Sequence, residues 1–71
     1  MHKKFSKGSW VLELDGNDDF VEAFLFTVDR KYSASLACVE GTGCVEGRDG
    51  EKVVPELIID WAVEIAENNG Y

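Results

Sequence analysis

Four carboxylates spaced for one helical face are the residues of this chain best suited to bind a charged partner. They are Glu56, Asp60, Glu64 and Glu67, and no Lys or Arg occurs among them. Because a helix advances by about 100° per residue, these positions fall within a wedge of roughly 80°. Like charges four residues apart destabilise an isolated helix by about 0.2–0.5 kcal/mol per pair. Nothing in the segment offsets that repulsion, so we interpret the stripe as a candidate binding surface.

The charge of the rest of the chain indicates what such a surface would bind. The formal net charge is -7, from 14 acidic residues and seven Lys and Arg. Three of these bases lie in the first seven positions, so residues 8–71 hold four bases against 14 acids, about -10. An acidic body repels nucleic acid and anionic membranes but attracts basic protein surfaces. We therefore expect a larger protein partner, and no direct nucleic-acid or membrane partner. Further predicted contact residues are Asp18, Asp19 and Glu22.

Residue patterns typical of enzymes do not occur in this sequence. Nucleophilic catalysis needs a base beside the nucleophile, and His2 is the only histidine. The glycines from Gly41 to Gly50 form neither a phosphate-binding loop nor a dinucleotide fingerprint. We therefore expect a non-catalytic protein without a cofactor.

A calcium-loop pattern begins at Asp15, Asn17 and Asp19 but does not continue. Phe20 stands where such a loop needs glycine, and Phe26 where it needs a bidentate glutamate. We interpret the segment as a polar turn and expect no metal site there.

Cys38 and Cys44 are the only two cysteines. If residues 40–42 form a three-residue hairpin loop, the cysteines lie opposite each other at a separation that suits a disulfide. A reducing cytoplasm would usually keep them as thiols. The interpretations left open are two buried thiols, a disulfide or redox-sensitive pair, and part of a metal site. Zinc is disfavoured because four ligands are normally needed.

Two segments in the first half of the chain predict strands. Residues 10–15 alternate between apolar and polar side chains, which indicates a strand with one buried face. Residues 15–19 are rich in turn-forming residues. Residues 20–28 are apolar on both parities, which favours a strand that is central or covered twice. The alternative for this segment is a short helix capped by Asp18 or Asp19.

Two shorter strands are expected in the middle of the chain. Residues 33–39 contain small side chains on one parity and Ala34, Leu36 and Cys38 on the other. Four glycines punctuate the following stretch, which leaves room only for a short strand over residues 44–46. The two segments are predicted to form the arms of a hairpin.

A C-terminal helix is predicted over residues 55–69. Pro55 suits the first helical position, and Asn68-Asn69-Gly70 suits the end. The face expected to meet the sheet consists of Leu57, Ile58, Trp61, Ala62 and Ile65. Ile59, Val63 and Ala66 continue the apolar surface toward the acidic stripe, beyond what one sheet contact needs. Ile59 and Val63 are therefore a candidate dimer surface.

The sequence as a whole predicts one small α+β domain over residues 1–71. We expect an antiparallel meander of three or four strands, with the C-terminal helix packed on one face. Residues 1–8 are predicted to be a flexible basic arm. No apolar run of signal-peptide or transmembrane length follows it, so a cytoplasmic location is expected, in the host if the protein is phage-encoded.

These observations support three functional hypotheses. In size, acidity and lack of enzyme motifs the chain resembles small phage-encoded anti-defence proteins such as anti-CRISPRs and DNA mimics. That resemblance of composition implies an inhibitor that docks on a basic, nucleic-acid-binding surface. Carboxylates four residues apart on a helix are separated by about 6 Å along its axis, which suits mimicry of a phosphate backbone. The alternatives are a homo-oligomeric structural or accessory domain and a thiol-dependent regulator.

Overall fold

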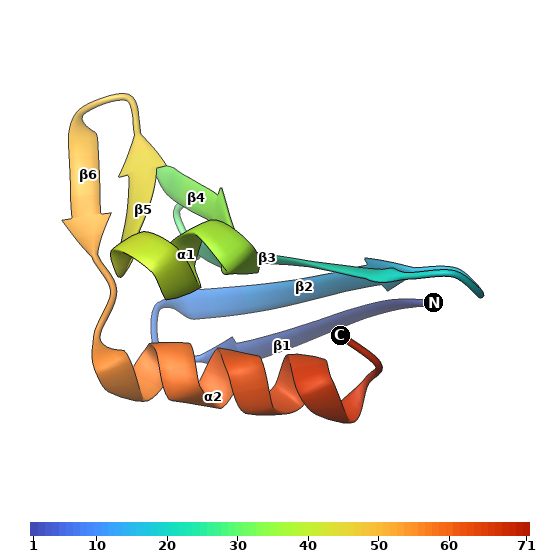
Figure 1. Ribbon diagram of the computed structural model, residues 1–71. Helices are drawn as coiled ribbons and strands as arrows, with labels where there is room; N and C mark the ends of the chain where they lie inside the picture. Colours follow the sequence, from blue (N-terminus) through green and yellow to red (C-terminus); the bar gives the residue numbers. More distant parts are fainter.

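The chain folds into a six-stranded antiparallel sheet with two helices (Figure 1). The computed structural model describes all 71 residues. Each strand pairs with the next one in sequence, so the sheet order is β1-β2-β3-β4-β5-β6. The bounds are β1 His2–Lys7, β2 Trp10–Gly16, β3 Val21–Thr27, β4 Tyr32–Ser35, α1 Leu36–Thr42, β5 Cys44–Gly47, β6 Gly50–Val53 and α2 Glu56–Asn68. The predicted α+β class and meander are confirmed, but the sheet has six strands instead of the expected three or four, and the fold has one helix more than expected.

The long hairpin of β2 and β3 supplies five of the twelve buried residues of the core cluster. Leu12, Leu14 and Leu25 are fully buried. The turn is closed by Asn17, whose N–H donates to the Phe20 carbonyl oxygen at 3.1 Å and whose side-chain oxygen accepts from the Asp19 N–H at 2.8 Å. The predicted strands and turn are therefore confirmed, and the alternative helix after residue 18 is wrong. β3 is central, as predicted, but its outer side chain Phe24 is exposed, so the strand is covered on one face only.

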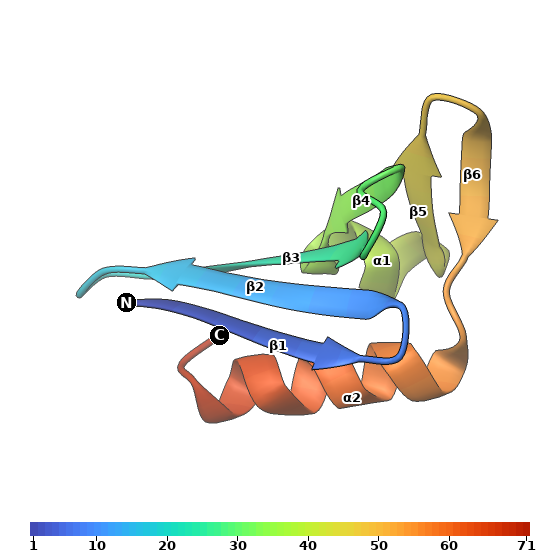
Figure 2. The same ribbon diagram turned by 180° about the vertical axis from the view of Figure 1, so that it is seen from behind.

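The N-terminal residues form an edge strand where we predicted a flexible arm over residues 1–8 (Figure 2). β1 pairs with β2 along its whole length, and the Met1 ammonium donates to the Gly16 carbonyl oxygen at 2.8 Å. Two features explain the difference. Gly8, with φ of 60°, permits the tight turn into β2, and Phe5 packs against the core. Lysine content alone therefore misidentified a paired strand as an arm.

The helix α1 replaces most of a predicted strand. Only Tyr32–Ser35 pairs as β4, and the chain turns helical at Leu36, so the predicted strand over residues 33–39 is wrong beyond Ser35. The Ser35 hydroxyl caps the helix by accepting from the Cys38 N–H at 3.4 Å. Gly43 ends it in a left-handed conformation, with its N–H donating to the Val39 carbonyl oxygen at 2.7 Å. The side-chain alternation over residues 33–39 fits a strand, but these two caps favour a helix from Leu36 onward.

The two hairpin turns at the far side of the sheet lie against each other. Gly47 is the last residue of β5, and a Cβ atom at this position would collide with the carbonyl oxygen of Lys31 in the β3–β4 turn. Only glycine allows this approach without a backbone shift. Figure 1 shows β5 and β6 rising steeply from the plane of β1–β3.

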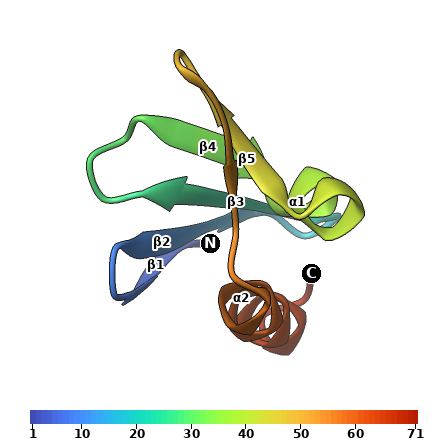
Figure 3. The same cartoon turned by 90° about the vertical axis from the view of Figure 1, so that its left-hand side faces the viewer.

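The helix α2 confirms the predicted C-terminal helix to within one residue at each end. The Asn69 side chain donates to the Ile65 carbonyl oxygen at 2.8 Å and closes the last turn. The side chains it buries are Ile58, Ala62 and Ala66, so the prediction that Leu57 faces the sheet is wrong; Leu57 is 70% exposed. Both helices contribute to one core cluster with β2 and β3, and Figure 3 shows α2 end-on beside the sheet. Neither helix is long and apolar enough to cross a membrane.

Candidate functional site: an acidic groove

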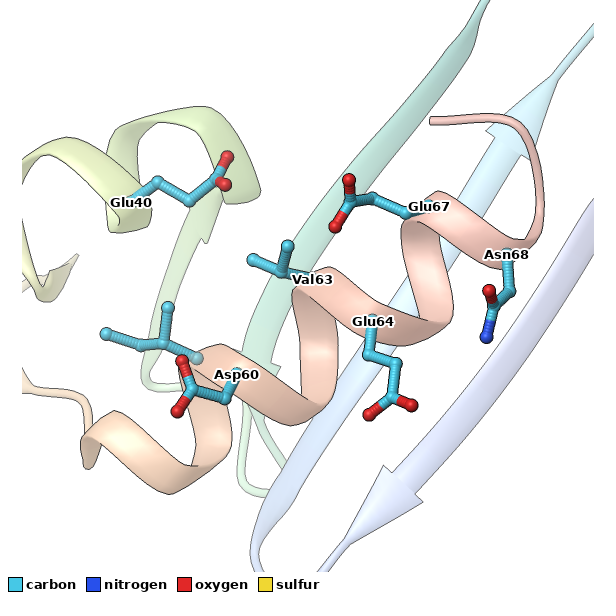
Figure 4. Close-up of a pocket in the computed structure, with 7 residues that line it drawn as sticks. Glu40, Asp60, Val63, Glu64, Glu67 and Asn68 are labelled. Carbon is cyan, nitrogen blue, oxygen red and sulfur yellow. The ribbon is translucent and has the colours of Figure 1, made fainter.

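A groove between α1 and α2 gathers most of the acidic stripe. Its volume is about 610 Å³. Figure 4 shows the side chains that line it, from both helices. They are Glu40, Ile59, Asp60, Val63, Glu64, Glu67 and Asn68. We call this surface the acidic groove.

The face of α2 that lines the groove is set by the face that it buries. Ile58, Ala62 and Ala66 pack into the core at spacings of four residues. Asp60 lies two positions after Ile58, and Glu64 lies two positions after Ala62. Both therefore point away from the sheet, and both are exposed. The groove acids thus have fixed positions because the opposite face of the same helix is held by packing.

The opposite wall is Glu40, which sequence reasoning did not identify. Val39 is fully buried, which anchors α1, and its neighbour Glu40 is exposed at the groove. The Tyr71 hydroxyl donates to the Glu40 Oε2 atom at 3.1 Å and ties the chain terminus to this wall. The missed signal was the pair of helix caps, Ser35 and Gly43. Recognising them would have placed Glu40 on a helix.

Burial of the Tyr71 hydroxyl and its hydrogen bond to Glu40 raise the pKa of this tyrosine above its ordinary value of 10.0. The neighbouring carboxylate charge acts in the same direction. A raised pKa means that the folded state favours the protonated phenol. The Tyr71 hydroxyl therefore remains a donor to Glu40 throughout the neutral pH range.

No carboxylate of the acidic groove forms an ion pair. The ion pairs of the protein all join β1 to β2. Lys4 Nζ lies 3.6 Å from Glu13 Oε2. The His2 ring lies 3.6 Å from Asp15 and 4.0 Å from Glu13, and these two contacts are ion pairs only when the ring is protonated. Four acidic residues therefore line the groove without an ion-pair partner inside the molecule. Such a site gains from any cation that a ligand brings.

The structure brings together some of the predicted contact residues and leaves others apart. Asp60, Glu64 and Glu67 line the groove. Glu56 lies in the first turn of α2, exposed but outside the groove lining. The remaining predicted residues, Asp18, Asp19 and Glu22, are exposed in the β2–β3 turn and at the start of β3, also outside the groove lining.

The predicted dimer residues, Ile59 and Val63, lie on the lining of the same groove. Both are half-buried and pack against the core. A two-fold contact through these side chains would bring the groove carboxylates of two copies together. That repulsion disfavours this particular dimer surface.

The hairpin that placed the cysteines opposite each other is absent. Cys38 is exposed on α1, Cys44 is half-buried at the start of β5, and both are free thiols. The Thr42 hydroxyl joins the two segments, because it donates to the Cys38 carbonyl oxygen at 2.9 Å and accepts from the Cys44 N–H at 3.2 Å. The disulfide interpretation therefore loses its geometric basis, and the interpretation as two buried thiols is wrong for Cys38. No group of three or more His, Cys, Asp or Glu side chains is arranged to hold a metal ion.

Comparison with protein-family models, with characterised proteins and with solved structures gave no match to this chain. A functional assignment therefore depends on the groove itself.

Proposed function

We propose that this protein is a non-catalytic, acidic protein-binding module that inhibits a larger protein by occupying its basic, nucleic-acid-binding surface. The observation that carries the proposal is the absence of counterions in the acidic groove. Glu40, Asp60, Glu64 and Glu67 share one hollow, and none forms an ion pair. Their mutual repulsion is relieved only by cations from outside.

The lining of the acidic groove also suits the side chains that a basic surface presents. Lys and Arg carry long apolar stems that cover hydrophobic surface while their charged ends stay at polar groups. Ile59 and Val63 offer such apolar surface beside the carboxylates. An Arg guanidinium can bind a carboxylate with two parallel hydrogen bonds. A partner segment with several Arg or Lys residues therefore matches both parts of the lining.

The spacing of the carboxylates supports competition with nucleic acid. Asp60, Glu64 and Glu67 follow one another along α2 at intervals of four and three residues, which corresponds to about 6 Å and 4.5 Å of helix axis. A protein surface that binds successive phosphates presents cations at comparable intervals. Binding of the acidic groove to such a surface would exclude the nucleic acid by direct competition.

Affinity capture from a lysate of the native cell tests this function. The tagged protein is immobilised, washed at low and at high salt, and the retained proteins are identified by mass spectrometry. We expect a basic, nucleic-acid-handling protein that is released by salt, because exposed charge pairs are screened. Adding duplex DNA to the lysate should reduce its capture.

Two outcomes would contradict the proposal. One is a captured partner whose binding is insensitive to both salt and DNA. The other is a protein that only binds itself, which would favour the homo-oligomeric alternative.

A further inference from the structure

A second charged surface, opposite in sign, lies where the β3–β4 and β5–β6 turns meet. Arg30, Lys31 and Arg48 line a hollow of about 390 Å³ there, and Asp49 is the remaining lining residue. The hollow has no hydrophobic lining and shares no residue with the acidic groove. We call it the basic corner.

The basic corner is unexpected in a chain with twice as many acids as bases. None of its three cations has a carboxylate within ion-pair distance. The nearby Asp29 carboxylate accepts from the Thr27 hydroxyl at 2.6 Å and from the Lys31 backbone N–H at 3.0 Å. These two hydrogen bonds hold the pKa of Asp29 below its ordinary value of 3.8, opposed by partial desolvation and helped by the nearby lysine charges. The ionised Asp29 and the lining residue Asp49 offset part of this charge, so three cations against two carboxylates leave the corner with a net charge of about +1.

Two costly features bring these cations together. Arg30 adopts a left-handed backbone conformation, with φ of 61°, which is uncommon for a residue other than glycine, asparagine or aspartate. Gly47 allows the turn carrying Arg48 to press against the Lys31 carbonyl group. The two turns are held side by side by the pairing of β4 with β5, in which Tyr32 lies opposite Gly47.

The position of Arg30 is fixed further by an aromatic ring. The Arg30 guanidinium lies 4.9 Å from the centroid of the Phe26 ring. The backbone N–H of Arg30 donates to the Thr27 carbonyl oxygen at 2.8 Å. A side chain that is already held loses less entropy when a ligand binds. The Arg30 guanidinium is therefore partly ordered at the edge of the corner, over a Phe26 ring that itself lines a neighbouring hollow.

We propose that the basic corner binds a small phosphate monoester. Guanidinium groups bind phosphate oxygens in pairs, and a lysine adds a point charge. The volume falls in the range of small-ligand sites, about 300–1,000 Å³, and the polar lining suits a polar ligand body. The net charge of -7 opposes a long polyanion, so a small ligand is favoured over a nucleic acid. The site is independent of the acidic groove and of the function proposed for it.

NMR titration of the isotopically labelled full chain tests the proposal. The probes are glycerol 3-phosphate, inorganic phosphate and acetate, each added at constant ionic strength against chloride. We expect saturable shifts of the backbone amides of Arg30, Lys31 and Arg48, larger for the two phosphates than for acetate. Tighter binding of glycerol 3-phosphate than of inorganic phosphate would identify a phosphate monoester, and not free phosphate, as the ligand.

Variants separate a specific site from general charge. Arg48→Gln removes one charged donor, and Arg30→Asn removes another while keeping a residue that tolerates the left-handed conformation. Each should weaken phosphate binding about tenfold, as expected for one charge-assisted hydrogen bond. The matched control is Lys3→Gln, which removes the same charge at a side chain that contacts Asn69 instead.

Three results would overturn the proposal. They are shifts that rise linearly without saturation, an equal loss of binding in Lys3→Gln, and tighter binding of a single-stranded oligonucleotide than of glycerol 3-phosphate. Unchanged amide spectra away from the substituted residue would show that each variant remains folded.

Discussion

The acids of β2 and the acids of the groove differ in one respect, the presence of a counterion. Glu13 and Asp15 lie opposite Lys4 and His2 on the neighbouring strand, at distances of 3.6 to 4.0 Å. The acidic groove has four carboxylates and no cation. The same residue type therefore has two roles in one small protein, cross-strand pairing in the sheet and an unpaired surface on the helices. Only the second has electrostatic energy left to gain from a partner.

The largest expected effect is on partner binding. Changing Asp60 and Glu64 together to lysine should weaken the captured partner's affinity by about 100-fold, or roughly 2.7 kcal/mol, because two attractive contacts become repulsive. The matched control is Glu46→Lys with Glu51→Lys, which changes the net charge equally on an exposed hairpin outside the predicted contact residues. Calorimetric titration of each variant measures the difference. Equal losses in both double variants would mean that net charge, and not the groove, governs binding.

The second effect concerns the wall that carries Glu40. Ser35→Ala removes the hydroxyl that caps α1 and should lower the free energy of unfolding by about 1 kcal/mol. Urea denaturation followed by circular dichroism measures this change. We also expect weaker partner binding, since a frayed α1 no longer holds Glu40 at the groove. Unchanged stability would show that α1 is held by packing of Leu36 and Val39 alone.

Neutralising single acids should change stability in opposite directions in the two regions. Glu64→Gln relieves its repulsion with Asp60 and should raise the free energy of unfolding by about 0.2–0.5 kcal/mol. Glu13→Gln removes the pair with Lys4 and should lower it by about 0.2–1 kcal/mol. Both are measured by urea denaturation at low ionic strength. A change of the same sign in both variants would remove the distinction between paired and unpaired acids.

The smallest effect is a pH dependence at the rim of the acidic groove. Because the folded pKa of Tyr71 is raised, the protonated phenol is favoured, and its stabilising contribution is complete below pH 10.0. This contribution is lost as pH rises through the raised value. Absorbance titration of tyrosinate in the wild type and in Tyr71→Phe isolates the Tyr71 transition from that of Tyr32. A Tyr71 transition at or below its ordinary pKa would contradict the contact with Glu40.

The predictable parts of the fold are the elements whose hydrophobic pattern repeats over many residues. β2, β3 and α2 each bury one repeated face, which the sequence displays over seven or more residues. The first helix was not predictable by periodicity. It has seven residues, and its start and end are determined by Ser35 and Gly43 more than by an apolar pattern. Stretches this short fit a strand and a helix equally well.

The candidate site was predictable only on one of its walls. The α2 acids follow from helical spacing, whereas Glu40 joins them through tertiary packing of α1 against α2. The basic corner could not be predicted from the sequence, for a similar reason. Arg30 and Arg48 are 18 positions apart, and their meeting depends on two turns and on the close approach at Gly47.

Chemical-shift mapping with an arginine-rich peptide is the most direct test of the contrast between unpaired and paired acids. A nona-arginine peptide is titrated into the isotopically labelled protein, and the shifted backbone amides are assigned. If the unpaired carboxylates are the binding surface, the first and largest shifts fall on residues 59–68 and on Glu40. Equal or earlier shifts along residues 10–16 of β2 would contradict this claim. The paired acids of β2 would then bind the peptide as strongly as the acidic groove does.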